Sequence, residues 1–172
     1  MEYALPRVSR FKPSSQIDEF DRALERAMKL LAVRSRSRRE LADRLLGMGF
    51  GPVAVEKVDR RLAALGLVDD TEFALERVRH LLARGRSRRA AHLDLSGHGI
   101  GDDVIEFAVA EVDADQPELS RAVAIANTRA RRSLGDTPRK TYARVARYLS
   151  AQGFDPETVE EACREVFGDI EP

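Results

Sequence analysis

Residues 34–51 read RSRSRRELADRLLGMGFG, and residues 84–101 read RGRSRRAAHLDLSGHGIG. A shift of 50 residues therefore superimposes four arginines, a serine and three glycines of one copy on the other. A third, looser copy contains residues 153–156, GFDP, which correspond to residues 49–52, GFGP. Recurrence at a period of about 20 to 50 residues indicates repeated structural units that stack on one another.

Each copy carries the pattern of three short helices. Apolar residues recur every three or four positions, the spacing of one helix face. In the first copy they are Leu24, Ala27 and Leu31, then Leu41 and Leu45, then Val55, Val58, Leu62 and Leu65. Ser37 with Glu40 three residues later indicates a capping box at the start of the second helix. Gly49 is typical of a helix end, and Pro52 is typical of the first position of the next helix.

These signals predict an all-α fold of three tandem three-helix repeats that form an elongated, curved array. The expected parts are a flexible N-terminal arm at 1–19, repeats at 20–69, 70–116 and 117–169, and a C-terminal tail at 170–172. A chain with no tryptophan and 6% aromatic residues is poorly suited to a β-sandwich or barrel. Ala90 stands where the first repeat has Glu40, so we expect the second capping box to be missing, at a cost of about 1 kcal/mol or less.

Composition and hydropathy limit the class of protein. The 172 residues include 43% hydrophobic ones, enough to build a folded core. Cys163 is the single cysteine, which excludes a disulfide framework and a multi-thiolate metal site and fits a reducing compartment. No apolar run approaches the roughly 18 residues of a membrane span, and residues 1–12 lack the apolar stretch of a signal peptide. We therefore expect a cytoplasmic protein without membrane association.

Charge is segregated along the chain, although the 29 basic and 29 acidic residues cancel. Residues 22–94 hold 17 basic and 10 acidic residues, and residues 121–150 hold 8 basic residues and 1 acidic residue. Residues 95–120 hold 7 acidic and no basic residues, and residues 151–172 hold 7 acidic residues and 1 basic residue. Such alternation is typical of basic and acidic helix faces that lie near one another, or of a partner that contacts the basic segments.

Residue patterns for catalysis or for cofactor binding are weak. Two GxGxG runs, at 47–51 and 97–101, resemble phosphate-binding loops, but no strand pattern precedes them and their glycines stand at expected helix ends. His80, His92 and His98 have no metal-binding spacing, and Cys163 falls on the apolar side of the last helix. We therefore predict no catalytic residue, no cofactor and no metal ion, and we expect that the protein is not an enzyme.

The basic residues form three clusters at comparable places in the repeats. Arg38 and Arg39, like Arg88 and Arg89, fall in the first turn of a predicted helix, where the helix dipole disfavours a cation by about 0.3–1 kcal/mol. Recurrence of this arrangement favours contact with DNA phosphates or an acidic protein surface, and shared ancestry of the copies is the alternative. The candidate contact residues are Arg36, Arg38, Arg39, Arg86, Arg88, Arg89, Arg129, Arg131, Arg132, Arg139 and Lys140.

Several of these stretches together resemble the RecX family of recombinase regulators. The most specific is residues 65–74, LGLVDDTEFA, and the similarity extends over about residues 23–167. The resemblance implies a protein that binds the RecA recombinase and lodges in the groove of its filament on DNA. It further implies that the protein restrains filament growth, strand exchange and RecA ATPase activity, and thereby modulates recombination and DNA repair.

A direct DNA-binding regulator of the helix-turn-helix type is the alternative function. Beside the RecA filament, we expect weak, non-specific contact with single- or double-stranded DNA. Aromatic residues for base stacking are sparse, because Tyr142 and Tyr148 have the spacing of core residues. We also expect a monomer.

Overall fold

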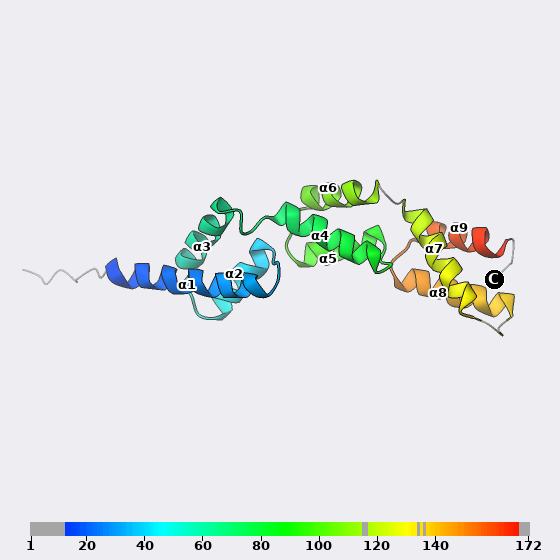
Figure 1. The fold of residues 1–172 in the computed structure, drawn as a ribbon, viewed down its shortest axis with the longest axis horizontal. Helices are drawn as coiled ribbons and strands as arrows, with labels where there is room; N and C mark the ends of the chain where they lie inside the picture. Colours follow the sequence, from blue (N-terminus) through cyan, green and yellow to red (C-terminus); the bar gives the residue numbers. More distant parts are fainter. Residues whose placement is uncertain (1–12, 115–116, 134, 136, 169–172) are drawn as a thin grey trace, which may run out of the picture. The chain divides into compact units, whose positions relative to one another are not determined.

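The computed structural model describes residues 13–114, 117–133, 135 and 137–168. Within these residues the regular elements are nine α-helices (Figure 1). Their bounds are α1 Pro13–Val33, α2 Arg38–Gly47, α3 Pro52–Ala64, α4 Asp70–Ala83, α5 Arg88–Gly97, α6 Asp102–Asp113, α7 Glu118–Arg131, α8 Pro138–Ala151 and α9 Pro156–Phe167. The all-α prediction is confirmed.

The helices form three sets of three, and each set has its own hydrophobic core. Repeat 1 (α1–α3) buries Leu41, Leu45 and Leu62 among other apolar residues. Repeat 2 (α4–α6) has a core around Leu95 and Ile105, and repeat 3 (α7–α9) has one that includes Leu149, Val145 and Cys163. Three tandem three-helix repeats are therefore confirmed, because each short amphipathic helix finds its apolar partner within its own set.

The starts of α2 and α5 are fixed by two equivalent buried serines, Ser37 and Ser87. The Glu40 N–H donates to Ser37 Oγ at 3.1 Å, and the Ala90 N–H donates to Ser87 Oγ at 3.0 Å. Both serine hydroxyls therefore act as N-caps, the usual way to satisfy a backbone donor at a helix start. The cap of α5 forms although Ala90 provides no capping-box carboxylate.

Helix α1 begins at Pro13, within the segment 1–19 that the sequence predicts as a flexible arm. Residues 13–19 instead continue the first helix of repeat 1. Glu19 accepts a hydrogen bond from the Gly51 N–H at 2.7 Å, which ties this part of α1 to the start of α3. The rest of the predicted arm, 1–12, and the predicted tail, 170–172, lie outside the described residues.

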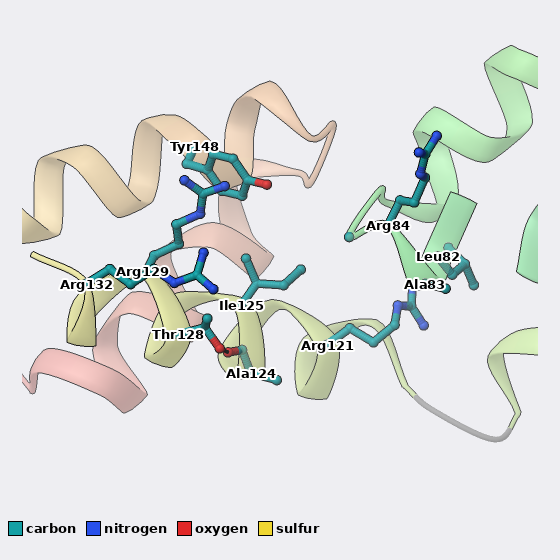
Figure 2. Close-up of a pocket in the computed structure, with 11 residues that line it drawn as sticks. Leu82, Ala83, Arg84, Arg121, Ala124, Ile125, Thr128, Arg129, Arg132 and Tyr148 are labelled. Carbon is teal, nitrogen blue, oxygen red and sulfur yellow. Dashed lines mark hydrogen bonds between the residues drawn. The ribbon is translucent and has the colours of Figure 1, made fainter. Parts of the chain in front are cut away.

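The chain divides into two compact units at the boundary between Val68 and Asp69. Repeat 1 belongs to the first unit, and repeats 2 and 3 together make up the second. Within the second unit, the Ser87 N–H donates to the Gln152 carbonyl at 3.1 Å, and α7 lies opposite the end of α4 (Figure 2). Repeats 2 and 3 are therefore joined by specific polar contacts.

Candidate functional site

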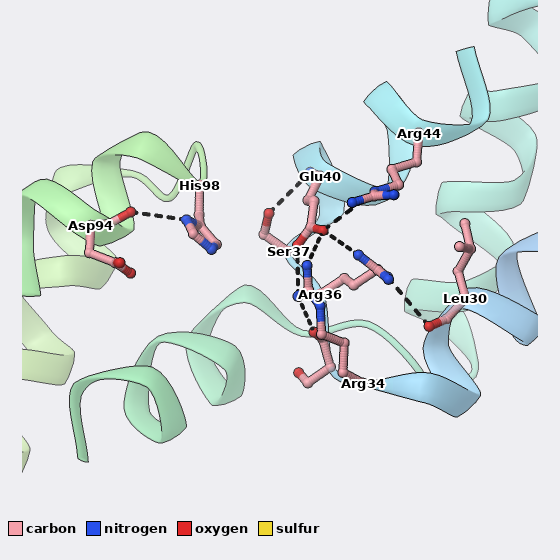
Figure 3. Close-up of polar contacts among 9 residues, drawn as sticks. Leu30, Arg34, Arg36, Ser37, Glu40, Arg44, Asp94 and His98 are labelled. Atoms are coloured by element: carbon pink, nitrogen blue, oxygen red, sulfur yellow. Dashed lines mark hydrogen bonds and ion pairs between the residues drawn. The ribbon is translucent and has the colours of Figure 1, made fainter. Parts of the chain in front are cut away.

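The cationic cluster of repeat 1 is organised around one carboxylate, that of Glu40 (Figure 3). Arg34 Nη1 donates to Glu40 Oε2 at 3.0 Å, and Arg36 forms an ion pair with Oε1 of the same carboxylate. Arg44 approaches Oε1 at 3.7 Å. The Arg36 side chain is 6% exposed and also donates through Nε to the Leu30 carbonyl at 3.3 Å. This geometry makes Arg36 a structural residue of repeat 1.

These arginines stabilise the ionised form of the Glu40 carboxylate. Partial burial of the carboxylate opposes ionisation, but hydrogen bonds and charges from Arg34 and Arg36 outweigh it and lower the pKa of Glu40. The carboxylate therefore remains ionised at neutral pH and neutralises guanidinium groups that would otherwise be desolvated without a counter-ion.

Arg38 and Arg39 are neighbours in the first turn of α2 with different surroundings. Arg38 donates through Nε to Asp59 Oδ1 at 2.9 Å and also binds Asp59 Oδ2, so one carboxylate of α3 holds it bidentately. Arg39 is exposed, and its nearest carboxylate, Asp43, is 3.9 Å away and equally exposed. An exposed pair at that distance contributes little to stability. Arg39 is therefore the member of the pair that is open to a partner.

In repeat 2 the corresponding arginines reach toward repeat 3. Arg86 donates to the Ala151 carbonyl at 3.3 Å. Arg88 lies 3.0 Å from Glu118 Oε2 and 3.3 Å from Asp113 Oδ2, and its backbone N–H donates to Glu118 Oε1 at 2.7 Å. The carboxylate of Glu118 thus occupies the anion site that the sequence predicts at the start of α5. That site is filled by the chain itself.

A buried arginine that sequence reasoning missed completes this junction. The Arg121 side chain is 5% exposed, pairs with Asp113, and lies 3.9 Å from Glu118. Asp113 and Glu118 therefore connect Arg88 of α5 with Arg121 of α7. In the sequence, Arg121 stands out only as the first basic residue after the acidic segment 95–120. That position does not predict that its side chain is buried.

The third cluster lies at the end of α7 and the start of α8. The Arg129 guanidinium stacks over the Tyr148 ring, 3.5 Å from its centroid, so Tyr148 supports a cation. Tyr142 instead packs against Phe167, with ring centroids 5.8 Å apart. Four further members of the cluster are exposed, namely Arg131, Arg132, Arg139 and Lys140.

Exposure and pairing distinguish two groups among the predicted contact residues. Arg129, which stacks on Tyr148, and Arg139, which has a partner in the structure, belong to neither group. Arg36, Arg38, Arg86 and Arg88 are engaged by acceptors of the chain. Within the described part of the chain, the side chains of Arg89, Arg131, Arg132 and Lys140 are exposed and have neither an ion pair nor a hydrogen bond. This second group, together with Arg39, has guanidinium or ammonium donors available for phosphate or carboxylate groups of a partner.

Other groups singled out in the sequence have structural positions. Gly49 and Gly99 adopt φ of 88° and 77° at the ends of α2 and α5, as expected for helix C-terminal turns. Cys163 is fully buried, and burial raises the pKa of its thiol, which makes it a poor nucleophile. Among the residues that the structure describes, no group of His, Cys, Asp and Glu could hold a metal ion, and none of the helices could cross a membrane.

Acidification should weaken the contact between α4 and α5. Arg77 donates to both oxygens of Asp94, at 2.7 and 2.8 Å, and this hydrogen bonding lowers the pKa of Asp94 against the opposing effect of burial. A lowered pKa gives stability that is present above the pKa of the unfolded chain and is lost as pH falls through that of the folded chain. We expect Asp94→Asn to be less stable than the wild type at pH 7, with the difference shrinking toward about pH 3. Urea unfolding across this range measures it, and a difference independent of pH would contradict it.

Comparison with known proteins gives consistent matches. The family model for the first three-helix domain of RecX matches residues 23–62, and the model for the third three-helix domain matches residues 116–163. The regulatory protein RecX of Mycobacterium ulcerans (strain Agy99) is 36% identical over 172 residues, covering 99% of this chain and 95% of the relative. That of Mycobacterium tuberculosis (strain ATCC 25177 / H37Ra) is 37% identical over 140 residues, covering 81% of this chain and 80% of the relative.

Solved structures support the fold. The crystal structure of RecX from Lactobacillus salivarius is similar with a TM-score of 0.75 at 22% identity, over 87% of this chain and 97% of that chain. The fold and the cationic clusters define the class of the molecule, a helical-repeat protein with arginine-rich surfaces on its repeats. The chain belongs to the RecX family of regulatory proteins, so the resemblance seen in the sequence is confirmed.

Proposed function

We propose that this chain binds the filament of the RecA recombinase on DNA and restrains filament growth, strand exchange and ATP hydrolysis by the recombinase. Recombination and DNA repair are modulated as a result. The observation that carries this proposal is the 36% identity over 99% of the chain to a protein named regulatory protein RecX. The chain is expected to perform no reaction itself.

The distribution of available cations supports a polymeric partner. Arg39 belongs to the first unit, whereas Arg89, Arg131 and Arg132 belong to the second. Each such contact is weak alone, but contacts made by two linked units add through effective concentration. The exposed acidic residues Asp102 and Asp103 on α6 oppose binding to DNA alone. We therefore expect only weak, non-specific binding to free DNA.

Reversing the available charges should weaken inhibition of the recombinase. The test variant is Arg39→Glu with Arg89→Glu, because Arg38 and Arg88 are held by carboxylates and their replacement would disturb the fold. We expect the concentration that half-inhibits DNA-dependent ATP hydrolysis by RecA to rise about tenfold, since like charges at an interface are repelled. The measurement is ATP hydrolysis by RecA on single-stranded DNA with increasing amounts of each variant.

A matched control keeps the same change of net charge elsewhere. Arg79 of α4 and Arg147 of α8 are exposed and lie outside the candidate set. Arg79→Glu with Arg147→Glu should leave inhibition near the wild-type value. Equal inhibition by both double variants would remove Arg39 and Arg89 from the interface. Failure of the folded wild-type protein to inhibit, together with tight, sequence-selective binding to free duplex DNA, would favour a direct DNA-binding regulator instead.

A further inference from the structure

A pocket of about 500 Å³ lies between repeats 2 and 3, within the second unit (Figure 2). The last turn of α4, one side of α7 and Tyr148 of α8 line it. Among the described residues, its charged lining residues are Arg84, Arg121, Arg129 and Arg132, and no described acidic side chain lines it. A pocket of this size and charge is suited to an anionic group.

The charge of this pocket is only partly compensated. Arg121 is paired with Asp113. Within the described residues, no carboxylate lies in ion-pair distance of Arg84, Arg129 or Arg132. Three cationic side chains from two repeats therefore line one concave surface, Arg129 and Arg132 on one side and Arg84 on the other (Figure 2), with no described carboxylate as their counter-ion. Such a surface attracts an anionic ligand and raises its local concentration.

Arg129 is held in position before any ligand binds. Its guanidinium carbon lies over the Tyr148 ring, 3.5 Å from the ring centroid. The two side chains lie beside each other at one side of the pocket (Figure 2). Stacking uses the face of the guanidinium and leaves its in-plane N–H groups available to donate. Those N–H groups match the two oxygens of a carboxylate or a phosphate. Because the side chain is already ordered, less conformational entropy is lost on binding.

Part of the pocket lining is apolar. Leu82 and Ala83 of α4 face Ala124 and Ile125 of α7 across it. The two elements approach closely here, because a Cβ added at Gly85 would lie 3.2 Å from Ile125 Cδ1. A ligand that fills this pocket must therefore combine an apolar group with anionic groups beside it.

We infer that the pocket binds a segment of a partner protein in which an apolar side chain is flanked by carboxylates. The apolar side chain rests on Ile125 and Leu82, and the carboxylates meet Arg129, Arg132 and Arg84. A nucleic acid fits less well, because a phosphodiester backbone has no apolar side group and Arg129 already covers a face of Tyr148 on which a base would stack. The inference rests on the proposed function, because the recombinase is the partner that would supply such a segment.

The test uses a probe that requires no recombinase. A fluorescein-labelled peptide of alternating leucine and acidic residues is titrated with the full-length chain, followed by fluorescence anisotropy. A peptide with glutamine and asparagine in place of the acids and a short oligothymidine are titrated in parallel. We expect Arg129→Gln with Arg132→Gln to weaken binding of the acidic peptide about tenfold or more, since charge-assisted hydrogen bonds are lost. Arg84→Gln, on the other repeat, should weaken it as well.

The controls separate the pocket from general charge. Arg79→Gln with Arg147→Gln removes the same charge outside the pocket and should leave peptide affinity nearly unchanged. The uncharged peptide should bind the wild type at least about tenfold more weakly than the acidic one. Circular dichroism of each variant checks that the helices are retained.

Three results would overturn the inference. The first is that the folded wild type does not bind the acidic peptide. The second is that the control double variant loses as much peptide affinity as the pocket variant. The third is that binding of the oligothymidine, and not of the peptide, depends on Arg129 and Arg132. Inhibition of RecA that persists without peptide binding overturns the pocket assignment and leaves the proposed function standing. Peptide binding by a wild-type chain that never inhibits RecA overturns only the proposed function.

Discussion

Glu40→Ala lowers the free energy of unfolding of repeat 1 by about 3–5 kcal/mol, because it leaves the Arg36 guanidinium buried without its carboxylate. The substitution gives repeat 1 an alanine at the position equivalent to Ala90 of repeat 2. In repeat 2 that alanine is accommodated, since Arg86 instead donates to the Ala151 carbonyl of repeat 3. Amide hydrogen exchange of α2 measures the loss directly in the first unit.

Two controls define this result. Asp43→Ala removes an exposed acid from the same helix and should change stability by less than about 0.5 kcal/mol. Arg36→Met combined with Glu40→Ala should recover most of the loss, because no charge is then buried without a partner. A loss below about 1 kcal/mol for Glu40→Ala alone would show that water solvates Arg36 well enough to replace the ion pair.

Gly153→Ala should weaken the contact between repeats 2 and 3 and lower stability by about 2–4 kcal/mol, which combines backbone strain with steric overlap. Gly153 has φ of 95°, a region that residues with a Cβ rarely adopt. An added Cβ would lie 2.7 Å from Ser87 Oγ and 3.0 Å from the Ala90 Cβ. Tyrosine fluorescence during urea unfolding follows this region, because the chain has no tryptophan and Tyr142 and Tyr148 lie in repeat 3.

Repeat 1 provides the matched control for this prediction. Gly49 occupies the equivalent turn with φ of 88°, but nothing lies within 4 Å of a Cβ placed there. Gly49→Ala should therefore cost only the backbone strain, about 1–2 kcal/mol. Equal costs for the two substitutions would mean that the contact between the Gly153 turn and the start of α5 contributes nothing to stability.

Much of the fold could be predicted from local patterns. The recurring serine before each second helix forms an N-cap in repeats 1 and 2, and the glycine turns take the positive φ expected of helix ends. Ala90 lacks a capping-box carboxylate, and the Gly153 turn of repeat 3 also lies close to it, since a Cβ added at Gly153 would be 3.0 Å from the Ala90 Cβ.

The candidate site was less accessible to prediction. Arg38 and Arg88 occupy equivalent places in the sequence, yet Asp59 of the same repeat holds the first and Glu118 of the next repeat holds the second. No spacing rule connects an arginine with a carboxylate 21 or 30 residues away. Which cations remain available to a partner therefore depends on packing between helices that are distant along the chain.

The amino-acid order alone was enough for the helices, the three repeats and the family, because helix periodicity, caps and turn glycines act over a few residues. Tertiary packing determines which arginines are paired within the chain and which are available to a partner. It joined repeats 2 and 3 through Glu118, Asp113 and the Gly153 turn, and it formed the arginine-lined pocket between them. The physical reason is the separation of the partners along the sequence. A hydrogen bond within one helix turn joins residues that are close in sequence, whereas a salt bridge between helices forms only after folding brings distant residues together.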